Sequence, residues 1–193
     1  MKNILALNLG GGTITLIVIA MVVVFLILYL ISVYNKLIAL RENVRNSMSQ
    51  IATQIESRWD VITNLIGATS KYSEHEAKTL REVIGMRTGI NRNSSAAEVL
   101  KDDQLFQQAM DRINVVVESY PNLKADSLYI NTMNNVDKYE NNVRNARMIF
   151  NDSVTKYNRE ILMFPKNIFA GMFGFQQEIY FKNSETKADM PQW

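Results

Sequence analysis

The strongest hydrophobic pattern of the chain is an unbroken apolar run near its beginning. The run extends from Thr13 to Val33 and contains no charged residue, glycine or proline. As a helix that rises about 1.5 Å per residue it would span roughly 31 Å, the thickness of a bilayer's hydrocarbon core. A buried core helix is seldom this long without a charge, and a signal peptide would have a shorter run and a small-residue cleavage site. We therefore predict a single-pass transmembrane helix over 13–34.

Beyond this span the apolar positions become periodic, with steps that alternate mostly between three and four residues. Such spacing is typical of helices that pack lengthwise in a bundle. The first stripe predicts a helix from Lys36 to Ile84, about 70 Å long, with Gly67 as a place for a bend and Gly85 and Gly89 at its end. Its positions are Leu37, Arg41, Val44, Met48, Ile51, Ile55, Arg58, Ile62, Leu65, Thr69, Tyr72, Glu76, Leu80 and Val83.

Two further stripes complete the predicted bundle. Residues 89–95 have the composition of a loop, and Ser95 with Glu98 has the spacing of a capping box that starts a second helix. Pro121 ends this helix, and the short connection 121–126 makes the third helix its antiparallel neighbour. The third stripe alternates without exception over five heptads, as in a left-handed bundle. The second stripe holds Phe106, Met110, Ile113, Val117 and Tyr120, and the third holds Tyr129, Met133, Val136, Glu140, Val143, Arg147, Phe150, Val154, Tyr157, Ile161 and Phe164.

The predicted fold is therefore all-α, an N-terminal transmembrane helix that leads into a long antiparallel helical bundle. We expect a short extracytoplasmic leader over 1–12, in which the glycines at its end are a flexible lead, and the transmembrane helix over 13–34. The bundle occupies 35–165, and an aromatic-rich packing segment follows over 166–181. The polar tail 182–193 is expected to be disordered.

Charge and composition restrict the function. Lys36, Arg41 and Arg45 follow the span whereas only Lys2 precedes it, so the positive-inside rule places the N-terminus outside and the bundle in the cytoplasm. The formal net charge of +2 and the lack of a basic block give no indication of a nucleic-acid partner. The chain has no cysteine, which excludes disulfides, zinc–thiolate sites and thiol catalysis.

Four charged residues fall on the apolar stripes: Arg58, Glu76, Glu140 and Arg147. They form either a polar site inside the bundle or, as we favour, interhelical ion pairs and side chains that extend to water. Antiparallel packing would bring Arg58 near Glu140. The only histidine, His75, lies between two glutamates, but neighbouring helical residues point about 100° apart and do not converge on one ion. We expect no metal, cofactor or catalytic residue.

The segment after Pro165 is rich in aromatic residues and is a candidate interaction segment. It either touches lipid or a partner, or folds back on the bundle as a lid. We favour the lid, because few basic residues are present to hold anionic lipid. Its candidate residues are Phe164, Phe169, Phe173, Phe175 and Phe181.

Six segments spread along the chain carry a family resemblance. They are YNKLIALRENVRNS at 34–47, RWDVITNLI at 58–66, YSEHE at 72–76, ESYPNLKA at 118–125, VTKYNREILMFP at 154–165 and the pair Gly174 and Phe175. In this order and spacing they resemble the LemA family, which differs by often having proline where Thr63 stands. The resemblance implies a bacterial, single-pass, mostly helical membrane protein with a short outer N-terminus, a cytoplasmic bundle and no established enzymatic activity.

Three functions remain open on the sequence. The first, which we favour, is a non-catalytic scaffold or adaptor in the bacterial cell membrane that binds itself or another protein. The second is a signalling stalk that passes a change through the span. The third is an enzyme with a carboxylate site at Glu140 and Glu76, although no common catalytic motif is present. Membrane lipid around 13–34 and a homo-oligomer or another protein are the expected partners, and no small-molecule substrate is evident.

Overall fold

The computed structural model is mainly helical. It describes residues 11–69, 78, 81–82, 84–85 and 87–181. Its elements are α1 (Gly11–Thr69), α3 (Ala96–Ser119), α4 (Pro121–Lys124), α5 (Ser127–Leu162) and α6 (Lys166–Met172). The described part of the chain contains no strand, which confirms the predicted all-α class.

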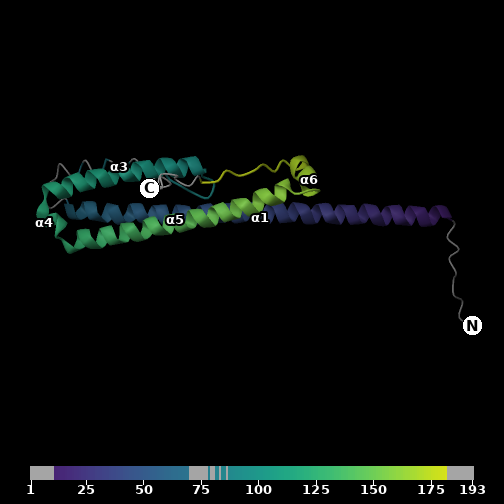
Figure 1. The fold of residues 1–193 in the computed structure, drawn as a ribbon, viewed down its shortest axis with the longest axis horizontal. Coiled ribbons are helices and arrows are strands. Elements are labelled where there is room, and N and C mark those ends of the chain that lie inside the picture. Colours follow the sequence, from purple (N-terminus) through teal and green to yellow (C-terminus); the bar gives the residue numbers. More distant parts are fainter. Residues whose placement is uncertain (1–10, 70–77, 79–80, 83, 86, 182–193) are drawn as a thin grey trace, which may run out of the picture.

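Helix α1 joins the apolar span and the bundle without a break. Its 59 residues extend about 88 Å, and its apolar first part is long enough to cross a membrane, with none of its most apolar stretch buried in the protein. Figure 1 shows this part projecting from the bundle. The helix begins at Gly11, so the expectation of a flexible glycine lead is wrong for Gly11 and Gly12, which form its first turn. The carbonyl of Gly11 there accepts a hydrogen bond from Thr15 Oγ1 at 3.0 Å.

The predicted extension of this helix to Ile84 lies partly outside the described residues. Thr69 is the last described residue of α1, and Glu76 and His75 fall in the undescribed range 70–77. At Thr63, where the family often has proline, the helix continues and the hydroxyl donates to the Trp59 carbonyl at 2.8 Å.

Helices α1 and α5 pack antiparallel in a single register. Three pairs define it: Lys36 with Glu160, Gln54 with Asn142 and Arg58 with Glu140. Each step of one residue forward along α1 therefore corresponds to a step of about one residue backward along α5. Helix α3 runs along both of them (Figure 1), and its Asp103 pairs with Arg58 of α1 and with Arg147 of α5. Described residues of all three predicted stripes meet in one core, whose largest fully buried side chains include Leu37, Ile51, Trp59, Ile62, Leu65, Phe106, Ile113 and Tyr157.

The helix boundaries follow from local capping. The predicted capping box is confirmed, since Ser95 Oγ accepts from the Glu98 N–H and a Glu98 carboxylate oxygen accepts from the Ser95 N–H. Pro121 stands at the start of the single turn α4, where its missing N–H costs nothing. Asp126 then caps α5 by accepting from the Leu128 N–H at 2.8 Å.

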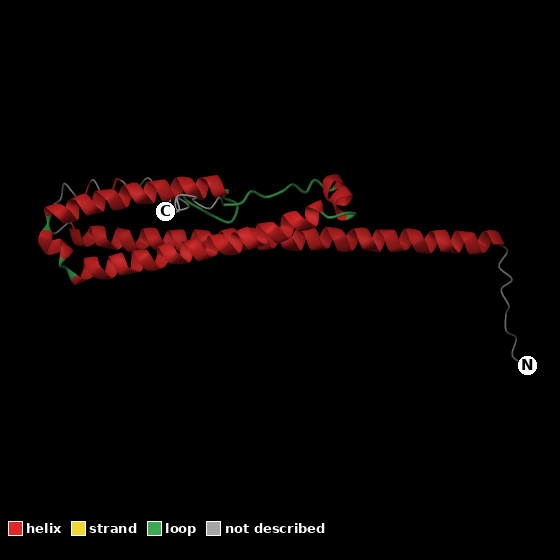
Figure 2. Cartoon of the chain, viewed as in Figure 1, coloured by secondary structure: helices red, strands yellow, loops and turns green. Residues whose placement is uncertain are grey.

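After α5 the chain turns at the membrane end of the bundle and runs back. Helix α6 packs against α1, and Gly174, at a φ of 72°, takes the left-handed conformation that reverses the direction. Residues 175–181, which we call the strap, then follow α5 as the irregular stretch drawn in Figure 2. The strap begins and ends with the buried rings of Phe175 and Phe181.

Candidate functional site

A buried charge cluster lies where α1, α3 and α5 meet, at the end of the bundle far from the span. Arg58, whose side chain is 2% exposed, donates from Nη1 to Glu140 Oε1 at 2.9 Å. Its Nη2 donates to Asp103 Oδ1 at 3.1 Å and lies 3.4 Å from Asp102 Oδ2. Asp103 also pairs with Arg147. Two arginines and three carboxylates from three helices are thus joined.

Asp102 is the buried centre of this cluster. Its Oδ2 accepts from Trp59 Nε1 at 2.9 Å, and its Oδ1 accepts from the N–H and the hydroxyl of Thr88 at 3.3 and 2.8 Å. The Phe106 ring lies 4.0 Å below the Arg58 guanidinium and meets Trp59 edge to face. Asp102 is completely buried, so these bonds replace the water that a charged carboxylate requires.

The chemistry of the cluster is structural. Asp102, Asp103 and Glu140 all accept hydrogen bonds from arginine, which leaves no free carboxylate aimed at a cavity. Across the described ranges, no group of three or more metal-binding side chains is positioned to hold an ion. The arrangement supports the ion-pair interpretation of Arg58, Glu140 and Arg147, and it offers no acid–base pair for a reaction.

The strap is held by two asparagines on one face of α5. Asn158 donates to the Glu178 carbonyl and accepts from its N–H, both at 2.9 Å. Asn151 does the same with Phe181, at 3.0 and 2.9 Å. Asn151 and Asn158 are seven residues apart, two helical turns, so both point at the strap. Each side-chain amide thereby satisfies the donor and acceptor of one strap residue, as a neighbouring strand would.

Aromatic and cationic side chains anchor the two ends of the strap. Phe181 packs edge to face on Phe150 with ring centroids 5.0 Å apart, and the Arg147 guanidinium lies 5.3 Å from its centroid. At the other end Phe175 lies under Arg41 at 5.2 Å and against Tyr34. Arg147 therefore links the strap to the buried charge cluster.

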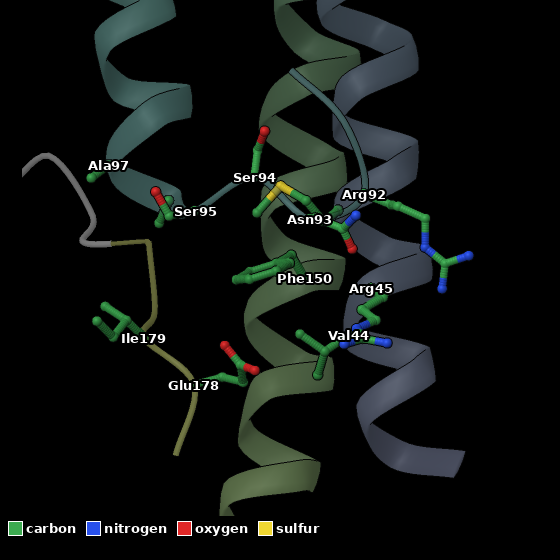
Figure 3. Close-up of a pocket in the computed structure, with 12 residues that line it drawn as sticks. Val44, Arg45, Arg92, Asn93, Ser94, Ser95, Ala97, Phe150, Glu178 and Ile179 are labelled. Carbon is green, nitrogen blue, oxygen red and sulfur yellow. The ribbon is translucent and has the colours of Figure 1, made fainter. Parts of the chain in front are cut away.

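A groove of about 320 Å³ opens between the strap, α1, α5 and the start of α3. Its wall includes Arg45 and Arg92, and its floor is made of Val44, Met48 and Phe150. Figure 3 shows Glu178 and Ile179 of the strap below Phe150, and above it Arg92, Asn93, Ser94, Ser95 and Ala97. We call this hollow the strap groove.

The two arginines that line the strap groove, Arg45 and Arg92, are already paired within the chain. Both donate to the carboxylate of Glu42, Arg45 at 2.9 Å and Arg92 at 2.7 Å. The hydrogen bond from Arg45 holds the pKa of the Glu42 carboxyl below its usual value. The N-terminus of α3 is capped by its own Glu98. The groove therefore offers an apolar floor and a polar rim whose arginines are already paired, which suits an apolar side chain of a peptide better than an anion.

A second ionic group lies at the membrane end of the bundle. Glu160 accepts from Lys36 at 2.8 Å and also pairs with Lys166 of α6. The hydrogen bonds from Lys166 and then Lys36 lower the pKa of Glu160, and the bond to Glu160 raises the pKa of Lys166. This group ties α6 to both long helices.

The structure brings some of the predicted site residues together and leaves others apart. Arg58, Glu140 and Arg147 come together, whereas Glu76 lies outside the described residues. Of the candidate interaction segment, Phe175 and Phe181 are buried and Phe169 is half-buried against α1. The expectation of a lid thus describes part of the segment, because Phe164 is 79% and Phe173 is 43% exposed.

Sequence reasoning missed Asp102 and Asp103, which accept from Arg58 beside Glu140, and it missed the residues that hold the strap. Asp102 falls between Val99 and Phe106 on a three-four stripe that extends the predicted face of α3, and a charge at such a position was a usable signal. Asn151 and Asn158 each follow a core aromatic residue of α5, and their spacing of seven was the corresponding signal for the strap.

Comparison with known proteins gives the relatives of this chain. It is 25% identical to Magnetosome protein MamQ 2 and to Magnetosome protein MamQ 1 of Paramagnetospirillum magneticum, over 91% of this chain and 75% of each relative. It is 22% identical to Magnetosome protein MamQ of Magnetospirillum gryphiswaldense, over 77% of this chain and 64% of that relative. The LemA family model matches residues 47–192, which include the charge cluster, the strap and most of the bundle. The chain therefore belongs to the LemA family.

Proposed function

We propose that this protein is a non-catalytic, membrane-anchored adaptor that binds a partner protein in the strap groove on the cytoplasmic face. One observation carries the proposal: the apolar stripe of α1 from Leu37 to Ile66 is already buried within a single copy. The described bundle therefore needs no second subunit to complete its core. What remains for binding is the groove and the exposed apolar residues of the C-terminal segment, which favours an adaptor over self-assembly through the stripes.

The groove suits a short extended peptide. Its floor of Val44, Met48 and Phe150 accepts one apolar side chain, while the strap wall presents Ile179 with 77% of its surface exposed. The polar rim supplies hydrogen bonds for the peptide backbone, in the manner of small recognition sites. The cytoplasmic placement rests on Lys36, Arg41 and Arg45 directly after the span.

Photo-crosslinking in native membranes tests the proposal. A photoreactive residue at Ile179 is expected to give a discrete product, whereas the same residue at Val115, 64% exposed on α3, serves as the control and gives none. Ala97→Trp, which fills the opening of the groove, is expected to abolish the product. A product of twice the chain mass would indicate self-association instead, and a product that persists in the Ala97→Trp variant would exclude the groove.

A signalling stalk is the second candidate, supported by the unbroken course of α1 from span to bundle. Replacing residues 14–27 with leucine keeps the span apolar and leaves Tyr29 and Tyr34 in place. An adaptor would keep its crosslink at Ile179 at wild-type yield, because the span only tethers it. A stalk that depends on the identity of the span would change the yield.

A further inference from the structure

An exposed apolar surface lies at the membrane end of the bundle, separate from the strap groove. Its members come from the end of α5, the turn that follows and α6, and none of them packs in the core. We call it the membrane-end patch, and it consists of Leu162, Met163, Phe164, Ile168, Met172 and Phe173. Phe164 and Met172 expose 79% and 74% of their surface, far more than a soluble surface usually leaves for side chains this large.

The register of the two long helices fixes the level of this patch. Lys36 pairs with Glu160, so the last turn of α5 lies beside the first residues after the predicted span. Helix α6 reaches beyond this level, to residues inside the predicted span. Phe169 meets Tyr29 with ring centroids 6.2 Å apart, and Phe173 meets Tyr34 at 5.2 Å. Tyr29 is five residues inside the span, which corresponds to roughly 7 Å along the helix.

Helix α6 presents an apolar face outward. Ala170 is completely buried and Phe169 packs on α1, while Ile168 and Met172, one turn apart, point away from the bundle. The exposed face continues directly into the bare surface of the span, where Leu28 is 60% exposed. Figure 1 shows α6 beside α1 at the point where the bundle ends and the bare helix begins.

We propose that the membrane-end patch is an interfacial foot that lies in the headgroup and upper acyl region of the same bilayer that the span crosses. Interfacial helices insert about 5–10 Å, which agrees with the depth set by Tyr29. Tyr29, Tyr34, Lys36 and Lys166 surround the foot, the residue types that gather at membrane boundaries.

The foot differs from a free amphipathic helix in how it is held. A seven-residue helix is too short to fold on its own, but α6 is fixed by its rings on α1 and by Lys166 on Glu160. Its apolar face is therefore preformed, and insertion needs no further ordering. Lipid contact at the foot does not depend on whether the strap groove binds a partner.

Spin labelling of the full-length protein in vesicles tests the foot. The chain has no cysteine, so Met172→Cys supplies a single site for a nitroxide. Met148→Cys, also at an exposed methionine but further along α5 from the membrane, is the matched water-facing control, and Leu28→Cys is the lipid-facing reference. The protein is reconstituted in phosphatidylcholine–phosphatidylglycerol vesicles, and collision with oxygen and with a water-soluble nickel chelate is measured.

The expected result is a several-fold higher ratio of oxygen to nickel accessibility at 172 than at 148, approaching the ratio at 28. A ratio at 172 equal to that at 148 would place the patch in water and overturn the proposal. Protection of the 172 label from both reagents would mean that protein covers the patch, which would overturn it equally. Ile168→Cys gives an independent reading of the same face, should the 172 variant fold poorly.

Discussion

The two ends of the bundle are held together by different chemistry. At the far end, Arg58 and Asp102 are almost completely buried, and each is bonded to residues of other elements. At the membrane end, a partly exposed ionic group and a strap held by two asparagines close the structure. The far end is therefore fixed as a unit, while the membrane end is joined by contacts that can open separately. The surfaces that we assign to binding belong to the strap and to the membrane end.

The largest effect on stability is expected at the far end of the bundle, when Arg58 is replaced. Arg58→Met leaves Asp102 buried without its cation, and loss of one partner from a buried pair costs about 3–5 kcal/mol. Urea unfolding of the detergent-solubilised protein, followed by circular dichroism, measures the loss. Arg144→Met, an exposed arginine on α5, is the matched control and should change the unfolding free energy by less than about 1 kcal/mol. A similarly small effect for Arg58→Met would contradict the assigned role of the cluster.

The second prediction concerns the strap. Asn158→Ala removes both hydrogen bonds to Glu178, which costs about 1–3 kcal/mol. The substitution should lower the free energy of local opening of the strap and leave that of the far end unchanged. Amide hydrogen exchange should therefore become faster over residues 175–181 and stay the same around Arg58. Asn145→Ala, at an exposed position on the same helix, provides the control. Equal acceleration at both ends would mean that the bundle opens as one unit.

The third prediction uses pH at the membrane end. Because lysine hydrogen bonds depress the folded pKa of Glu160 below 4.5, its stabilisation is full above that value and is lost as pH falls through the folded pKa. Lys166 has a raised pKa, so its share is full below 10.5 and is lost only at more alkaline pH. Glu160→Gln should thus reduce stability by about 1 kcal/mol at neutral pH, and the difference from wild type should close on acidification. Unfolding curves from pH 7 to 3 measure it, and a constant difference would refute the assignment.

The smallest effect is expected at the rim of the strap groove. Arg92→Ala removes an ion pair to Glu42 between two solvent-accessible side chains, which water and salt screen strongly. The midpoint of thermal unfolding should not change measurably at low or high salt. A clear decrease would show that the rim, and not only the strap, holds the groove together.

The helices and their pairing were accessible from sequence because both depend on regular spacing. The alternation of threes and fours in α5 predicts its course, and a charge on each facing stripe brings Arg58 to Glu140 as expected. The prediction failed at Phe164, which continues the stripe by number but lies beyond the end of α5 and is exposed. Spacing carries no information once Pro165 has ended the helix.

The strap was much less accessible from sequence, because its own residues have no period and the seven-residue spacing of Asn151 and Asn158 is its only regular feature. Phe175 and Phe181 are buried by an irregular stretch whose backbone bonds to the side chains of Asn151 and Asn158. Asparagine is a poor helix former, and its frequency in this helix indicates only that packing must compensate. Which of the asparagines do so depends on where the chain returns, a property of the folded molecule.

The continuity of α1 has a mechanical consequence. From Tyr34 to Thr69 the helix extends about 52 Å beyond the predicted membrane boundary, with α3 and α5 bracing it. Transmembrane helices tilt to match the thickness of their bilayer. With no hinge, 10° of additional tilt would swing the far end sideways by roughly 9 Å, about the diameter of a helix. The protein would act as a lever that converts a small change in bilayer thickness into lateral displacement at the end of the bundle far from the membrane.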